Sequence, residues 1–181
     1  MRLPVVARQF EEIEVEEADI ISLTQGLIGF PTLRKYVILK YDEAMPFQWF
    51  QCLEDPYLAF VIINPLIFRP DYRVKISREE VAGLEINDPA SVTVHTIVTI
   101  PPDPGMITAN LQAPILINNE NRLGKQVILL EQEYTTQHLI LEELQRNTRL
   151  RLPKKAEIIT FCPTPNPSSC LPPTFSPVRE P

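Results

Sequence analysis

Proline is the residue that most restricts how this chain can fold. The 181 residues include nineteen prolines and only five glycines. Proline has no backbone N–H and fixes φ at about −65°, so it interrupts helices and belongs at strand edges, in turns or in unstructured chain. This content favours short elements joined by frequent turns over long helices.

Short segments rich in aromatic and β-branched residues predict a mainly β fold. Ser91–Ile100 is the clearest strand, and alternate residues share one face: Val92, Val94, Thr96 and Val98. The other predicted strands are Tyr36–Lys40, Phe47–Cys52, Leu58–Ile63, Tyr72–Ile76, Ala113–Asn118 and Gln126–Leu130, with turn chemistry at Asn118-Asn119 and Leu123-Gly124. Val5–Phe10 and Ile13–Glu17 predict a hairpin that turns at Glu11–Glu12. Regular short strands of this kind favour a sheet sandwich or a small barrel.

Helix is predicted at two places. Ser77–Leu84 begins with Ser77 and has Glu80 three residues later, which is the pattern of a capping box. Leu139–Leu150 carries acids early and arginines late, as the helix dipole prefers. The sequence therefore divides into a β domain over residues 1–138, a short helix over 139–152 and a tail over 153–181.

The tail differs in composition from the rest of the chain. It holds eight of the nineteen prolines among Ser, Thr and Asn. Such a stretch cannot bury a hydrophobic core, so the Pro-rich tail is predicted to be mostly disordered. Ala156–Phe161 is the one segment that we expect to dock as a short element.

Charge is unevenly distributed. Residues 1–145 hold 11 Lys and Arg against 21 Asp and Glu, a balance of −10, whereas residues 146–181 hold six against two, a balance of +4. An acidic body repels phosphate backbones, so direct nucleic-acid binding is disfavoured and a basic or neutral protein partner fits better.

The chain is expected in the cytoplasm, without membrane contact. Its N-terminus does not resemble a signal peptide, and no apolar run reaches the roughly 20 residues that span a bilayer. Three cysteines cannot all pair within one chain, which agrees with reduced thiols.

The sequence offers no positive sign of catalysis. His95 lies within a predicted strand with no carboxylate or thiol beside it, and His138 is expected to be an exposed loop residue. The cysteine and histidine spacings are unlike those of zinc sites, and neither a P-loop nor a dinucleotide-binding turn is present. We therefore predict a non-enzyme without cofactor or metal. A scattered site assembled by folding stays open as an alternative.

Three segments carry a family signature. They are Gly26–Pro31 (GLIGFP), Pro46–Pro56 (PFQWFQCLEDP) with its continuation to Asn64-Pro65, and a C-terminal set formed by Val98–Pro101, Thr108–Ile115 and Gly124–Leu129. In this order and at these spacings they resemble the FliW family of flagellar assembly factors, over about residues 2–136. Gln137 and Leu139 depart from the pattern, because the family usually has a basic residue and a proline there.

The resemblance implies a small antiparallel β-barrel-like fold and a regulatory role without catalysis. Members of the family bind the RNA-binding translational repressor CsrA and also bind flagellin, and the two partners compete. When flagellin is exported, the freed factor binds CsrA at a surface other than its RNA-binding site. Flagellin mRNA is then released from repression by CsrA. Our hypothesis is that the acidic body assists RNA release by lowering the positive potential of CsrA. Alternatives are a flagellin-binding chaperone without CsrA activity, and a β-barrel enzyme or small-ligand binder.

Partner contacts are predicted at polar and turn residues within or near these segments. Apolar residues such as Trp49, Phe50, Phe60 and Val127 are expected in the core. The loops Phe68–Tyr72 and Pro101–Pro104 are expected to be exposed, and rigid loops with an aromatic residue suit recognition. The predicted partner-binding residues are Asn64, Phe68, Asp71, Tyr72, Pro101, Pro104 and Asn110. For Asn and Asp, a structural role in a turn is an equal alternative.

Overall fold

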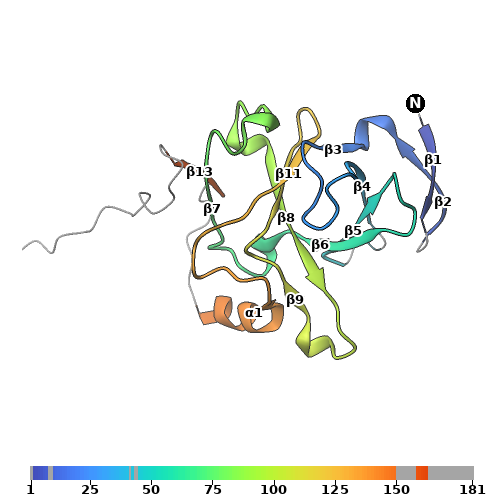
Figure 1. Cartoon of the computed structure of the whole chain (residues 1–181). Coiled ribbons are helices and arrows are strands. Elements are labelled where there is room, and N and C mark those ends of the chain that lie inside the picture. Colours follow the sequence, from blue (N-terminus) through green and yellow to red (C-terminus); the bar gives the residue numbers. More distant parts are fainter. Residues whose placement is uncertain (1, 8–9, 41, 43–44, 150–157, 163–181) are drawn as a thin grey trace, which may run out of the picture.

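The computed structural model describes residues 2–7, 10–40, 42, 45–149 and 158–162. Figure 1 shows a β-barrel with a hairpin at one end and a single labelled α-helix below it. The strands are β1 (Arg2–Ala7), β2 (Phe10–Glu16), β3 (Ile21–Leu23), β4 (Lys35–Leu39), β5 (Phe47–Cys52), β6 (Ala59–Ile63), β7 (Val74–Ser77), β8 (Val92–Thr99), β9 (Thr108–Ala109), β10 (Ile115–Asn118), β11 (Leu123–Gln126), β12 (His138–Leu139) and β13 (Ile159–Cys162). The helices are α1 (Ile140–Arg149) and the 3₁₀ turns η1 (Glu17–Asp19), η2 (Pro65–Ile67), η3 (Ala82–Leu84), η4 (Pro89–Ser91) and η5 (Pro104–Met106).

One sheet closes on itself to make the barrel. Its strand order is β10-β11-β3-β4-β5-β6-β8, and β8 pairs back onto β10, with His95 opposite Ile115. The pairings are antiparallel except between β3 and β11, which run parallel with Leu123 opposite Ser22. Two short strands, β9 and β12, extend the sheet beyond β8. The mainly β, barrel-like fold predicted from the sequence is confirmed.

The core has two parts on either side of the barrel wall. The interior is filled by side chains from barrel strands and the Gly26 loop: Ile21, Leu23, Leu27, Tyr36, Phe50, Cys52, Ile62, Ile115 and Ile117. The outer part lies against β8 and β10 and is covered by residues 63–84, 127–140 and 158–161. The barrel wall therefore has apolar residues on both faces in this region.

Strand β8 belongs to both parts of the core. Val92, Val94, Thr96 and Val98 are all buried, as the alternating pattern predicts. The valines pack in the outer core, whereas Ile97 packs against the interior. Both faces of this strand are covered, which explains why its sequence is nearly continuous in β-branched residues.

The expected strand boundaries are wrong at two turns. The hairpin of β1 and β2 forms, but Glu11 and Glu12 lie within β2 rather than in a turn. Leu123 and Gly124 lie within β11, whereas the turn predicted at Asn118-Asn119 is confirmed, because the Arg122 N–H bonds to the Asn118 carbonyl across it. Gly124 is needed because a Cβ there would lie 2.8 Å from a methyl carbon of Leu23 on β3. Close strand approach, rather than turn formation, explains this glycine.

The two predicted helices have different outcomes. Leu139–Leu150 forms α1 with nearly the expected bounds. Ser77–Leu84 is wrong as a helix, although Ser77 and Glu80 make the reciprocal hydrogen bonds of a capping box. Ser77 is the last residue of β7, and the chain then makes only turns and η3. Most of the tail over 153–181 lies outside the described residues, but Ile159–Cys162 docks as β13, within and just past the predicted element.

The loop that follows β3 depends on Gly26 and Gly29. Gly29 has a φ of +91°, which side chains rarely tolerate. A Cβ on Gly26 would lie 2.1 Å from the carbonyl oxygen of Phe30. The tight turn places the Phe30 ring edge-on to Phe60, with ring centroids 5.5 Å apart. The Phe30 and Phe60 contact fastens the loop to β6.

We expect Gly26→Ala to lower the free energy of unfolding by about 3 kcal/mol, since the methyl group meets backbone atoms that can move only with the loop. The matched control is Gly83→Ala, where the nearest atom lies 3.5 Å away on the Thr24 side chain. We expect this second variant to change stability by less than about 1 kcal/mol. Urea unfolding followed by Trp49 fluorescence measures both, and equal effects would contradict the close approach at Gly26.

Candidate partner-binding site

The segment from Asn64 to Arg73 leaves β6 and crosses the outer core. The side chain of Asn64 accepts a hydrogen bond from the Leu66 N–H at 2.9 Å and so begins η2. Phe68 is fully buried, and the Arg69 N–H bonds to the Pro65 carbonyl. These local bonds fix the backbone that carries Arg69 and Asp71.

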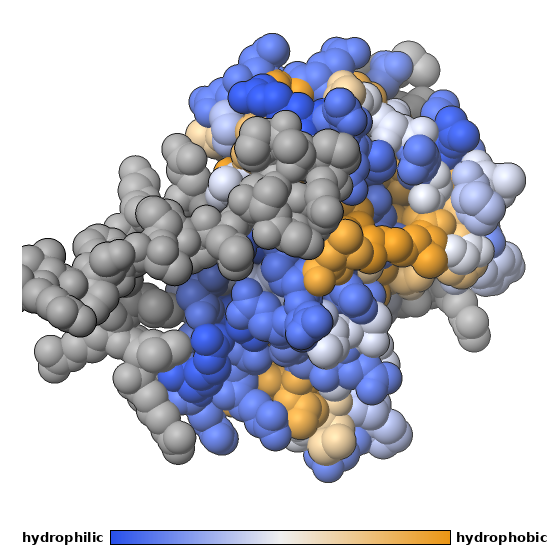
Figure 2. Space-filling view, turned by 60° about the vertical axis from the view of Figure 1, so that its left-hand side comes forward, coloured by the Kyte–Doolittle hydropathy of each residue, from blue (hydrophilic) through white to orange (hydrophobic). Residues whose placement is uncertain are grey.

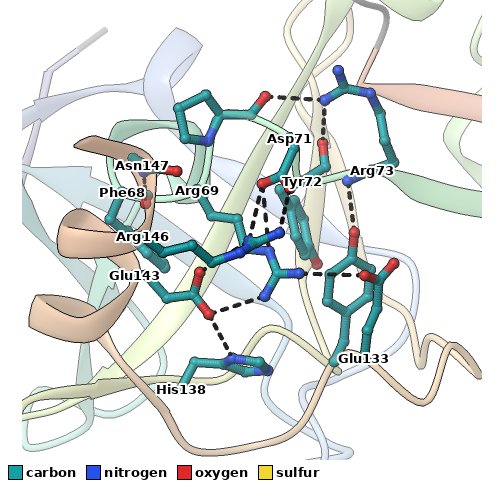
Figure 3. Close-up of polar contacts among 12 residues, drawn as sticks. Phe68, Arg69, Asp71, Tyr72, Arg73, Glu133, His138, Glu143, Arg146 and Asn147 are labelled. Carbon is teal, nitrogen blue, oxygen red and sulfur yellow. Dashed lines mark hydrogen bonds and ion pairs between the residues drawn. The ribbon is translucent and has the colours of Figure 1, made fainter. Parts of the chain in front are cut away.

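Arg69 is the centre of a network of ion pairs (Figure 3). Its guanidinium nitrogens lie 2.9 Å from Glu143, 3.3 Å from Glu133 and 3.6 Å from Asp71. The side chain is 7% exposed, and its guanidinium carbon lies 5.2 Å from the centre of the Tyr134 ring. Removal of a cation from water is costly unless it is paired. The three carboxylates and the ring together offset that cost.

His138 extends this network from β12. The Thr135 N–H donates to Nε2 of His138 at 2.8 Å, so that nitrogen is the unprotonated acceptor. The proton then lies on Nδ1, which is 3.1 Å from Oε1 of Glu143 and donates to it. The side chain is only 13% exposed. The expectation of an exposed loop histidine is therefore wrong, because the imidazole bridges its own loop and α1.

Helix α1 is attached to the barrel at both ends. The Ile140 N–H donates to the carbonyl of Ile107 at the start of the helix. Near its end, Arg146 pairs with Asp71 at 2.8 Å, and Asn147 donates to the Phe68 carbonyl. The helix thus connects the two loops in which partner residues were predicted.

The loop between β8 and β9 is built on η5. Asp103 accepts a hydrogen bond from the Gly105 N–H at 2.9 Å and fixes the start of the turn. Pro104 is exposed and Pro101 is half-buried. Asn110 follows the loop and uses its side chain to accept from the Ala113 N–H, so it has the structural role of a turn residue.

The expectation that Phe68–Tyr72 is an exposed loop is wrong for both aromatic residues. Phe68 and Tyr72 have no exposed surface. The Tyr72 hydroxyl donates to the Leu111 carbonyl at 2.7 Å, and its ring lies 4.7 Å from that of Tyr134. Burial raises the pKa of this hydroxyl above its ordinary value. Asp71 is half-buried in its ion pairs, and Trp49 and Phe60, expected in the core, are also only half-buried.

The structure exposes apolar residues that the sequence prediction missed. Leu141 and Leu144 of α1 are 48% and 39% exposed, and Met106 of η5 and Ile100 before it are 52% and 53% exposed. We refer to these four residues as the α1–η5 face. Figure 2 shows two apolar areas on a mostly hydrophilic surface, and the lower one lies at the height of α1 and η5 in Figure 1. Leu141 and Leu144, three residues apart, were the signal for this face in the sequence.

His95 belongs to the barrel interior and not to this face. It lies opposite Ile115, a residue of the interior core, and is 7% exposed. Its Nδ1 makes no hydrogen bond within the described chain. Burial lowers the pKa of His95 to about 4. The described surroundings therefore hold the ring neutral and supply no carboxylate to orient it as a general base.

Two further features concern the described residues alone. No three His, Cys, Asp or Glu side chains among them are grouped as the ligands of a metal ion would be. No helix among them has the length and apolar character required to cross a bilayer.

We expect Arg69→Met to lower the free energy of unfolding by about 3 kcal/mol, because Glu143 is left buried without its closest cation. Arg122→Met is the matched control, since Arg122 pairs with the exposed Asp19 at 3.7 Å and its loss should cost less than about 1 kcal/mol. Urea unfolding gives both values, and amide exchange should show α1 opening first in the Arg69 variant. A loss no larger than that of the control would contradict the role of the network.

We also expect a pH dependence from His95. Its pKa is lowered in the folded state, so below about pH 6.5 the unfolded chain binds more protons and stability falls as the pH approaches 4. This group alone contributes a loss of up to about 3 kcal/mol. In the His95→Gln variant, the unfolding free energies at pH 7 and pH 5 should therefore differ by less than in the wild type, because the contribution of His95 is lost. An unchanged difference would contradict the buried neutral state.

Known proteins share this sequence and fold. A family model described as FliW protein matches residues 5–140. The flagellar assembly factor FliW of Alkaliphilus metalliredigens is 43% identical over 140 residues, which cover 77% of this chain and 86% of that protein. The corresponding factor of Ruminiclostridium cellulolyticum is 40% identical over 143 residues, covering 78% of this chain and 97% of that protein. A crystal structure of the flagellar assembly factor FliW superposes with a TM-score of 0.70 at 34% identity, covering 77% of this chain and 96% of that one. The matched region contains the whole barrel, and the chain belongs to the FliW family.

Proposed function

We propose that this chain is a non-enzymatic regulator of flagellar assembly that binds and antagonises CsrA and is itself sequestered by flagellin. The observation that carries the proposal is family membership across the entire barrel, since relatives matched over most of their length are named flagellar assembly factors. In this role the chain couples flagellin translation to flagellin export.

Features of the described residues support binding rather than catalysis. The interior of the barrel is filled by apolar side chains, and its one histidine is kept neutral by burial. The ion pairs around Arg69 and Arg146 hold α1 against the segment that follows β6. A rigid surface that keeps its shape before the partner arrives reduces the entropy cost of association.

The α1–η5 face is our candidate for the contact with CsrA. Its four residues are apolar, and exposed acids belong to the same two elements: Glu142 in α1 and Asp103 at the start of η5. An apolar centre with acidic surroundings fits a basic RNA-binding protein, because the apolar part supplies affinity and the charges guide the approach. Among the predicted residues, Pro101 and Pro104 belong to the same loop as Ile100 and Met106, and Asp71 pairs with Arg146 of α1. Asn64 caps η2.

The function is tested with purified full-length chain, CsrA and flagellin. We expect CsrA to bind the chain, to release its RNA on binding, and to be displaced when flagellin is added. RNA release should weaken as salt rises if the acidic body assists it electrostatically. Binding of flagellin without binding of CsrA would identify a chaperone instead, and binding of neither would contradict the proposal.

We expect the double variant Leu141→Glu with Leu144→Glu to weaken CsrA binding at least tenfold, since two apolar contacts at the centre of the face are replaced by charges. Tyr57→Glu is the control, because Tyr57 is 76% exposed and belongs to the loop between β5 and β6. Isothermal titration at one salt concentration measures both, and circular dichroism checks the fold. Equal affinities of the two variants would exclude the α1–η5 face.

A further inference from the structure

Strand β7 has only β13 as a partner among the described residues. The two strands run parallel, with Ile159 opposite Val74 and Phe161 opposite Ile76. The Val74 N–H donates to the carbonyl of Ile158 at 2.8 Å. In Figure 1 the pair lies at the side of the barrel, away from α1. The edge of β7 is therefore filled by a segment from the far end of the chain.

The backbone of β7 is held in place by its own side chains. Val74 and Ile76 are 0% and 3% exposed and pack in the outer core. Ser77 is fixed by its hydrogen bonds with Glu80. Without β13, this firmly held strand would present unpaired N–H and C=O groups, which is the geometry that accepts an added strand.

The side chains of β13 show what this edge selects. Ile159 is 2% exposed and joins the outer core, whereas Thr160 points outward and is exposed. Phe161 lies under Arg78, with the guanidinium carbon 4.5 Å from the ring centre. Backbone pairing gives affinity, and alternate side chains give specificity: a β-branched residue first and an aromatic residue two positions later.

Space remains beside the aromatic position. A pocket of about 190 Å³ lies between Phe161 and the turn after β7, and its wall includes Arg78, Glu85 and Asn87. A segment other than β13 thus has room for a larger or more polar side chain at this point.

Residues 158–162 are not part of the family region. The family model ends at residue 140, and β13 begins at Ile159. The factor of Ruminiclostridium cellulolyticum and the crystal structure are matched over 97% and 96% of their own length, so little remains in either to supply such a strand. The family region therefore contains β7 but not β13.

We propose that the β7 edge is a binding site for an extended peptide segment, and that β13 occupies it as a ligand supplied by the chain itself. The partner segment is uncharged, pairs in parallel and carries a β-branched residue followed two positions later by an aromatic one. Such a partner gains access when β13 leaves, so the tail competes with it. The site is separate from the α1–η5 face, and the inference does not rest on the proposed function.

The test uses the full-length chain and a fluorescein-labelled peptide of residues 158–162 with serine in place of Cys162. Ile159→Asp should expel β13 from the outer core, and Thr160→Asp, on the exposed face, is the matched control. We expect the peptide to bind the Ile159→Asp chain at least tenfold more tightly than the wild type or the control. Phe161→Ala provides a second expelled variant in case Ile159→Asp fails to fold.

Amide exchange at Val74 and Ile76 gives the second measurement. These amides should exchange faster in the Ile159→Asp chain and regain protection when the peptide is added, while amides of the barrel stay protected. Unchanged protection at β7 in both variants, or loss of protection without any gain in peptide affinity, would overturn the proposal. CsrA and flagellin are absent from this experiment, so its failure leaves the proposed function untouched.

Discussion

The pairing of Arg69 with Glu143 is the interaction on which the outer half of the molecule depends. It joins the segment after β6 to α1, and the same guanidinium reaches Glu133 in the segment that follows β11. A buried cation with several acidic partners fixes their relative positions, because any rearrangement would leave a charge unpaired in a medium of low polarity. The position of α1, and with it the α1–η5 face, therefore depends on the ion pairs of Arg69.

Prediction from the sequence succeeded where local pattern decides structure. The alternation in Ser91–Ile100 identified β8, and the early acids and late arginines identified α1. It failed where distant residues decide. Gly124 suggested a turn, although the side chains of β3 are what exclude a Cβ there. Phe68 and Tyr72 suggested an exposed loop, whereas residues more than 35 positions away, including Leu111 and Tyr134, enclose them. The sequence singled out Pro101, Pro104 and Asp71 as partner residues, which stays a prediction, but only the fold shows that α1 joins their loops.

The two histidines show how environment rather than residue type sets chemistry. His95 is buried, and its Nδ1 has no hydrogen-bond partner among the described residues, so it stays neutral well below the pH at which a free imidazole titrates. His138 accepts from a backbone N–H and donates to Glu143, which makes it a fixed connector. Neither histidine is arranged to exchange a proton with a substrate, and each is better explained by its place in the packing.

Closure of the barrel has a consequence for how the chain is made. Strand β3 finds its parallel partner in β11 about one hundred residues later, and β8 closes onto β10 only after Asn118 is available. As the chain leaves the ribosome, β3 to β6 can pair early into a curved sheet with two open edges. Strand β8 covers the β6 edge once Val92–Thr99 has been made. The β3 edge and the free side of β8 stay open until the segment from Ile115 to Gln126 arrives, and slow non-local pairing prolongs this interval. During synthesis the chain therefore passes through a stage in which its own first half requires protection from other nascent strands.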